Sequence, residues 1–241
     1  MYPKCDDTLI DVARFPNLTG VIDVIYNPLK TRLCQNATSN NILACNGLYM
    51  LVAQAVYASS IFKDKKINPN VIDKVYNKIL KQKQNIVLIG MPSCGKSTIG
   101  KKLAKKLKKD FIDIDKEIEK EIGTSIQTYI EINGENAFRD LEEEVTKKVS
   151  KGNNQVISTG GGVIKRSQNI IRLKQNGIIC FIDRPLELLK PTASRPLTND
   201  FEKLKKTFEE RYNIYMSSAD IVVENKEEFV KCADKIYREV K

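Results

Sequence analysis

The chain has 241 residues, of which 41% are hydrophobic and 29% are charged, and these near-average fractions exclude a wholly disordered protein. No apolar run reaches the ~18 residues that a membrane-spanning helix needs, and the start of the chain lacks the charged and apolar regions of a secretory signal peptide. Histidine is absent and the six cysteines are scattered singly, which excludes the usual Cys/His zinc sites and a histidine general base. We therefore expect a cytoplasmic protein with reduced cysteines.

The net charge of +10 comes from 40 basic and 30 acidic residues. Such an excess is compatible with a nucleic acid, an anionic lipid surface or a small anionic substrate. The densest basic cluster lies between Lys101 and Lys109, interleaved with the apolar stripe of Ile99, Leu103 and Leu107. This pattern is typical of the solvated face of a helix, so we expect neither nucleic acid nor a membrane as a partner.

A composition change marks a domain boundary near residue 83. The first 84 residues contain no glutamate, are rich in asparagine and end in the polar stretch KILKQKQ (78–84). We therefore expect two domains, 1–83 including a linker and 84–241. Within the first, the sequence predicts a helix over about 48–62 and loose order before it.

Beyond the boundary, short apolar strands alternate with amphipathic helices. The expected strands are 86–89, 111–114, 156–158, 178–182 and 220–223. The expected helices are 96–109, 125–132 (with capping-box spacing between Thr124 and Gln127), 137–148 after a turn at Asn133–Gly134, and 226–240. This alternation is typical of an α/β fold in which helices cover both faces of a parallel sheet.

The segment GMPSCGKS (90–97) fits the phosphate-loop pattern G-x-x-x-x-G-K-[ST] between a predicted strand and a predicted helix. Gly90 and Gly95 permit the backbone angles that turn N–H groups toward phosphate oxygens. Lys96 is expected to reach the β- and γ-phosphates, and the Ser97 hydroxyl to bind Mg²⁺. The expected ATP-binding residues also include Pro92, Ser93, Cys94 and Thr98.

Five further segments resemble shikimate kinase, in order along residues 85–241. They are FIDID (111–115), FRDLE (138–142), STGGG (158–162), SRPL (194–197) and ERYNIY (210–215). The resemblance implies a P-loop kinase domain with a five-stranded parallel sheet. It also implies ATP-dependent phosphorylation of the shikimate 3-hydroxyl, giving shikimate 3-phosphate and ADP, in the chorismate pathway of aromatic amino acid biosynthesis. The implied cofactor is Mg²⁺, and the implied kinase domain is a monomer.

The same resemblance assigns roles to single residues. Arg139 and Arg211 match the carboxylate-binding arginines, which suits a planar guanidinium. Asp115 matches the residue that orients the acceptor hydroxyl and takes its proton, and Asp113 the residue that holds Mg²⁺ through water. We expect these two aspartates on one side of a strand. Gly160, Gly161 and Gly162 match the glycines whose backbone N–H groups closely approach the substrate and the γ-phosphate. Arg195 matches the catalytic arginine of the family's mobile lid. Where the family has an arginine against adenine, the nearest candidate in this chain is Lys190.

Residues 1–62 resemble only the C-terminal part of shikimate dehydrogenase, through MYPKCDD (1–7), DVIYNPLKT (23–31) and NGLYMLVAQA (46–55). Tyr26 and Gln54 match substrate-contacting positions, and Gly47 and Met50 match positions beside the cofactor. The chain has no G-x-G-x-x-G loop for a dinucleotide pyrophosphate. We therefore expect a small α+β remnant of a Rossmann-type domain, in a dehydrogenase–kinase fusion without its front part, that is inactive as a dehydrogenase.

Two other functions stay open at this point. One is a P-loop kinase for another small hydroxy acid, such as gluconate, or for a nucleotide. The other is a non-catalytic protein that completes a split dehydrogenase. A nucleotide acceptor would favour stacking and amide groups where this chain has arginines, and the non-catalytic role would leave Asp115 without a function.

Overall fold

The structure is a computed structural model that describes residues 7–8, 10–189, 200–226 and 228–241. It divides into two compact units, Met1–Gln84 and Asn85–Lys241. Among the described residues, no helix is both long enough and apolar enough to cross a membrane.

The larger unit is built on a five-stranded sheet in the order β4-β5-β3-β6-β7, in which every pairing is parallel. The predicted five-stranded parallel sheet is therefore confirmed. Its central strand β3 is buried along its whole length, which explains the unbroken apolar run at this point of the sequence. The strands are β3 Asn85–Ile89, β4 Asp110–Asp113, β5 Gln155–Ser158, β6 Gly177–Asp183 and β7 Ile221–Glu224.

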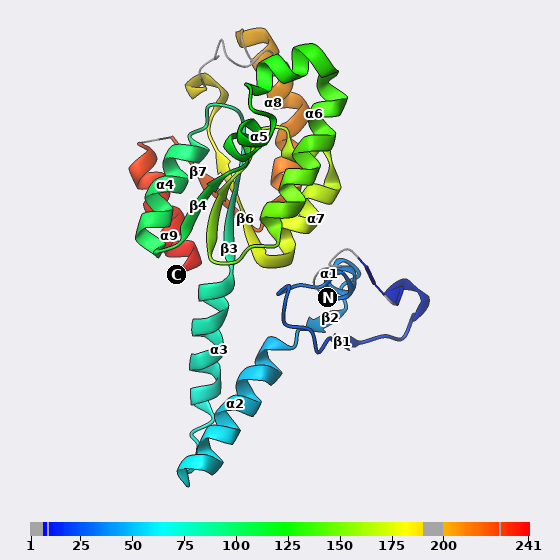
Figure 1. The fold of residues 1–241 in the computed structure, drawn as a ribbon, viewed down its shortest axis with the longest axis vertical. Coiled ribbons are helices and arrows are strands. Elements are labelled where there is room, and N and C mark those ends of the chain that lie inside the picture. The colour runs from blue at the N-terminus through cyan, green and yellow to red at the C-terminus, as the bar shows by residue number, and fades with distance from the viewer. Residues whose placement is uncertain (1–6, 9, 190–199, 227) are drawn as a thin grey trace. The chain divides into compact units, whose positions relative to one another are not determined.

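Helices cover both faces of this sheet (Figure 1), with α4 and α9 on one side and α6, α7 and α8 on the other. The apolar stripe predicted for the helix after the phosphate loop is buried in α4, where Ile99 and Leu103 have no exposed surface. The helices are α4 Lys96–Leu107, α5 Ile114–Ile122, α6 Ile126–Ser150, α7 Ser167–Asn176, α8 Phe201–Ser218 and α9 Phe229–Val240, and the short 3₁₀ turns are η2 Val163–Lys165 and η3 Leu186–Leu188.

Two details of the predicted elements need correction. Asp115 does not lie on a strand with Asp113, because β4 ends at Asp113 and Asp115 stands in the first turn of α5. The buried positions Ile114 and Ile118 are four residues apart, a helical rather than a strand period. The cap before α6 is Ser125 rather than Thr124. The expected turn at Gly134 is confirmed as a kink inside α6, where φ is 83° and ψ is 165°.

The smaller unit combines a two-stranded parallel sheet with a helical hairpin. Strands β1 (Gly20–Ile22) and β2 (Leu43–Cys45) pair in parallel through the connecting helix α1 (Arg32–Ser39). The hairpin consists of α2 (Leu48–Lys63) and α3 (Asn70–Lys83), and a 3₁₀ turn η1 (Val12–Arg14) precedes the sheet.

The predicted helix over 48–62 is confirmed by α2, whereas the loose order expected before it is wrong, because β1, α1 and β2 stand there. The segment expected to include a linker contains α3. Helix α3 forms because Ile72, Val75 and Ile79 make an apolar stripe that packs with Leu48 and Val52 of α2.

Candidate active site

The phosphate loop connects the end of β3 to the start of α4. Gly90 and Gly95 have φ of 148° and 96°, in the region that favours glycine. A Cβ on Gly90 would also lie only 2.8 Å from the carbonyl oxygen of Ile182. The loop carries Pro92, Ser93 and Cys94, and Thr98 follows in the first turn of α4.

Lys96 directs its charge into this loop. The side-chain Nζ donates hydrogen bonds to the carbonyl oxygens of Gly90 and Met91, each at 2.9 Å, and the residue is only 7% exposed. It stands at the N-terminus of α4, where the helix dipole also favours anions. Backbone N–H groups, dipole and ammonium together suit a phosphate chain.

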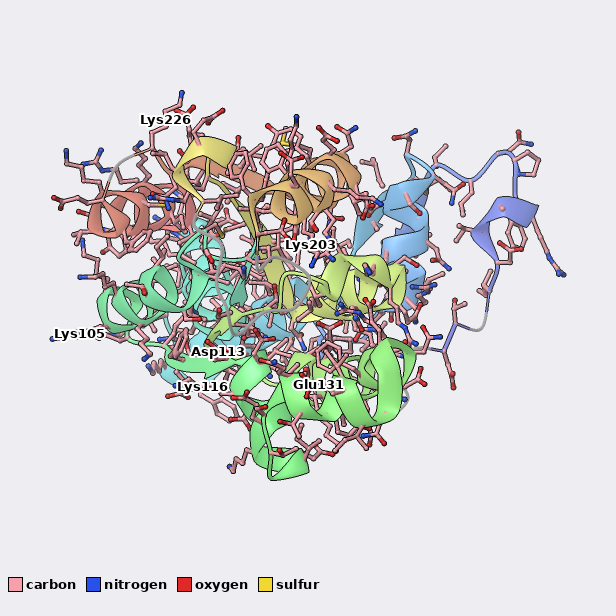
Figure 2. All side chains as sticks on the ribbon, turned by 90° about the horizontal axis from the view of Figure 1, so that it is seen from above. Lys105, Asp113, Lys116, Glu131, Lys203 and Lys226 are labelled. Carbon is pink, nitrogen blue, oxygen red and sulfur yellow. The ribbon has the colours of Figure 1, made fainter. Side chains whose placement is uncertain are left out.

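Ser97 and Asp113 are brought together from α4 and β4. The Ser97 hydroxyl donates to Asp113 Oδ2 at 2.6 Å and lies 3.3 Å from the hydroxyl of Ser158. Figure 2 shows Asp113 inside the outline of the kinase unit, whereas Lys105 and Lys226 project at its periphery. A hydroxyl and a carboxylate are hard oxygen donors, and Mg²⁺ prefers to keep water and phosphate oxygens beside one or two such donors. The residues therefore fit Mg²⁺ held mainly by a nucleotide.

A cavity of about 430 Å³ opens beside the phosphate loop. This volume is within the range of small-molecule sites. All of the residues expected to bind the acceptor and the metal line it. They are Ser97, Asp113, Asp115, Arg139, Gly160, Gly161, Gly162 and Arg211, and the lining also includes Pro92, Lys116, Glu135 and Glu142.

Arg139 is buried on α6 between two carboxylates. Its Nη1 donates to Glu142 Oε2 at 2.7 Å, and its Nη2 donates to Glu135 Oε1 at 3.1 Å. Burial alone would lower the pKa of Arg139, but the attraction of Glu142 and Glu135 outweighs it and raises the pKa. The guanidinium is thus fixed in a cationic form at the cavity wall.

Glu142 is 1% exposed, and burial raises the pKa of its carboxyl group while the charge of Arg139 opposes the rise. Its second oxygen, Oε1, is buried without a hydrogen-bond partner among the described residues. A Cβ on Gly160 would lie 2.6 Å from Asp115 Oδ1 and 2.9 Å from this Glu142 oxygen. Asp115 and Glu142 therefore approach the same glycine from α5 and α6.

The glycine triplet is held from α8. Arg211 Nη1 donates to the Gly161 carbonyl oxygen at 2.9 Å, and the hydroxyl of Tyr215 donates to the same oxygen. Gly162 faces Arg139 so closely that a Cβ would lie 2.2 Å from its Nη1. The Nε of Arg211 is buried and has no hydrogen-bond partner within the described part of the chain.

Two of the expected site residues, Lys190 and Arg195, lie outside the described residues. In the smaller unit, Tyr26 and Met50 are 43% and 50% exposed, and Gln54 is also exposed. Gly47 lies against the backbone of Val24, whose carbonyl oxygen would be 2.0 Å from a Cβ on this glycine.

Two residues beside the cavity, Glu135 and Lys165, were not singled out from the sequence, and they meet at 2.8 Å between α6 and η2. Tyr215, the last residue of the segment ERYNIY (210–215), holds the glycine loop. The four-residue spacing of Glu135 and Arg139 on one helix was an available signal. No local pattern places Lys165 opposite them, because the two elements are 30 residues apart in sequence.

A phosphate loop, an oxygen-ligand pair and an arginine-lined cavity at one edge of a parallel sheet define a P-loop kinase for a small anionic acceptor. The family model described as shikimate kinase matches residues 92–241. The chain belongs to the shikimate kinase family.

Individual relatives agree with this. A curated shikimate kinase from Clostridium beijerinckii is 43% identical over 158 residues, which cover 64% of this chain and 93% of that protein. The solved shikimate kinase from Acinetobacter baumannii in complex with shikimate has 31% identity and a TM-score of 0.64, covering 68% of this chain and 96% of that one. The structure from Aquifex aeolicus has 39% identity and a TM-score of 0.59, covering 65% and 96%. The protein is accordingly an ATP-dependent kinase that phosphorylates shikimate.

Proposed function

We propose that the cavity binds shikimate with its carboxylate against Arg139 and Arg211 and its reacting hydroxyl at Asp115. The observation that carries this proposal is that one cavity is lined by the phosphate-loop residue Ser97, by Asp115 and by both arginines. Two guanidinium groups suit a carboxylate because each presents paired donors in a plane.

In the proposed reaction, the hydroxyl oxygen of the acceptor attacks the γ-phosphorus while Asp115 accepts the hydroxyl proton, and ADP leaves. Lys96 and the loop amides stabilise the charge on the phosphate oxygens. Mg²⁺, when bound, would neutralise part of that charge, with Ser97 and Asp113 on its protein side. Pro92, Ser93, Cys94 and Thr98 remain proposed ATP contacts, as do Lys190 for adenine and Arg195 for the transferring group.

We also infer the setting of this activity. The proposed ligands are ATP and shikimate, and the kinase unit is proposed to act as a monomer in the cytoplasm, where ATP is available and thiols stay reduced. The cysteines at 34, 45, 94, 180 and 232 are free thiols, which agrees with a reducing compartment.

For residues 1–62 we propose a remnant of a Rossmann-type dehydrogenase without dehydrogenase activity. The parallel β1–α1–β2 unit supports this, because such crossovers belong to sheets covered on both faces. Here Ile22 and Leu43 on the two strands are 83% and 79% exposed. NADP-dependent oxidation of shikimate by the purified chain would contradict the proposal.

The binding mode is tested by replacing Arg139 with alanine. Leaving a bound carboxylate without its partner typically costs about 2–5 kcal/mol, so we expect KM for shikimate to rise at least about 30-fold, with KM for ATP nearly unchanged. Arg166→Ala is the matched control, because Arg166 pairs with Asp140 and Glu143 outside the cavity lining. Equal shikimate KM values for the two variants would overturn the proposed orientation.

A further inference from the structure

Glu135 and Lys165 form an ion pair at the edge of the cavity. Lys165 Nζ donates to Glu135 Oε1 at 2.8 Å. The same oxygen accepts from Arg139, from Nη2 at 3.1 Å and from Nε at 3.4 Å. Glu135 lines the cavity, whereas Lys165 on η2 is not among the lining residues. One carboxylate oxygen of Glu135 is therefore shared between a lysine and the guanidinium.

The lining of the cavity holds more carboxylates than cationic side chains. It contains five carboxylates (Asp113, Asp115, Glu119, Glu135 and Glu142) and three cationic side chains (Lys116, Arg139 and Arg211), so its formal charge is 3 − 5 = −2. An incoming carboxylate is repelled by such a wall unless a nearby cation compensates it. The side chain of Lys165 supplies a positive charge 2.8 Å from Glu135 Oε1.

Glu135 bonds both Lys165 and Arg139, so the charge of Lys165 affects how strongly Glu135 holds Arg139. Hydrogen bonds from Lys165 come first among the causes that lower the pKa of Glu135, ahead of those from Arg139. Without Lys165, the full charge of Glu135 would act on Arg139 alone and compete with an acceptor carboxylate for the same donors.

We propose that Lys165 is a positioning residue for acceptor binding, which neutralises Glu135 so that Arg139 remains available to the carboxylate of the acceptor. The inference rests on the proposed orientation of shikimate in the cavity. It differs from a plain surface ion pair between η2 and α6, which would affect folding stability but not the affinity for one substrate.

Steady-state kinetics of Lys165→Met tests the proposal. The side chains of Lys165 and Glu135 are both 37% exposed, so water partly screens their charges. Removing one such charge near the acceptor is expected to raise the shikimate KM about three- to tenfold. We expect kcat and the KM for ATP to stay within about twofold, the shikimate effect to shrink at high salt, and Lys165→Arg to restore the wild-type KM.

Lys174→Met is the matched control. Lys174 pairs with Asp220 at 3.1 Å with similar exposure, 28% and 32%, on residues outside the cavity lining, so its shikimate KM should equal that of the wild type. A double variant isolates the mechanism. In a Glu135→Gln background the charge to be neutralised is gone, so adding Lys165→Met should change the shikimate KM by less than about twofold.

An unchanged KM in Lys165→Met, or an equal rise in the Glu135→Gln background, would overturn the inference. So would a parallel loss of kcat and of affinity for both substrates, as a structural defect would give. If instead the wild-type chain itself shows no preference for shikimate, the proposed binding mode fails independently of Lys165.

Discussion

At the scale of single residues, Lys96 connects the phosphate loop to the chemistry. It is nearly buried, and its amine contacts loop carbonyl oxygens that would otherwise carry uncompensated negative charge beside the phosphates. Lys96→Ala is expected to lower kcat by about 10²–10³-fold or more, the range seen when one preorganised donor to a transition-state charge is removed. Rates of ADP formation at saturating ATP and shikimate measure this, and thermal unfolding serves as the control for an intact fold. A variant with near-normal kcat would mean that the loop amides suffice.

Also at this scale, the sequence predicts the residue types of the site better than their surroundings. Arg139, Arg211, Asp115 and Gly160 were expected as acceptor contacts, and all four line one cavity. The ion pair beside them could not be predicted, because Lys165 on η2 and Glu135 on α6 are 30 residues apart in sequence and meet only in the folded chain.

At the scale of elements, Glu143 ties α6 to the segment that follows the glycine loop. Its two oxygens accept from Arg166 at 2.8 Å and from Arg172 of α7 at 2.9 Å. The hydrogen bond from Arg166 is the largest cause that lowers the pKa of Glu143. Burial opposes the lowering of this pKa, and the hydrogen bond and charge of Arg172 add to it. The carboxylate form is therefore favoured in the folded protein.

This depressed pKa predicts a pH-dependent effect of Glu143→Gln. A group whose folded pKa is lowered stabilises the protein above its unfolded pKa and loses that effect as the pH falls through the folded pKa. At pH 7 the variant should lose about 0.5–1 kcal/mol of unfolding free energy, since the pair is partly exposed. The gap to the wild type should narrow as the pH falls below the ordinary glutamate pKa of about 4.3 and close below the lowered folded pKa, where both proteins carry a neutral group. Urea unfolding of the kinase unit at pH 7 and at about pH 3 measures it, and a gap of the same size at both pH values would contradict the account.

Element boundaries depend on burial that the sequence shows incompletely. The apolar pattern of FIDI (111–114) fits the start of a strand, yet Ile114 and Ile118 are both fully buried on one face of α5. Tertiary packing therefore moves Asp115 into a helix while keeping it at the cavity. Likewise, the polar residues at the end of α3 suggested a linker, although the apolar stripe of this helix packs against α2. The parallel sheet was predictable because its strands are short, apolar and bounded by turns.

At the scale of the whole molecule, the two units have separate cores and the site residues described here all belong to Asn85–Lys241. We expect a chain lacking residues 1–84 to keep kcat and both KM values within about twofold. Limited proteolysis should remove the smaller unit first, because it buries less apolar surface and small units are correspondingly less stable. Loss of kinase activity on deletion, or a full-length chain that resists protease throughout, would contradict this.

The central claim is that guanidinium groups at the cavity recognise the carboxylate of the acceptor while the phosphate loop presents ATP. The most direct test measures ADP release with shikimate and with its carboxamide, in which the negative charge is removed and the ring hydroxyls are kept. Saturable ADP release with shikimate is predicted, with kcat/KM at least about 30-fold lower for the carboxamide, equivalent to about 2 kcal/mol. Equal kcat/KM for the two compounds would contradict the account.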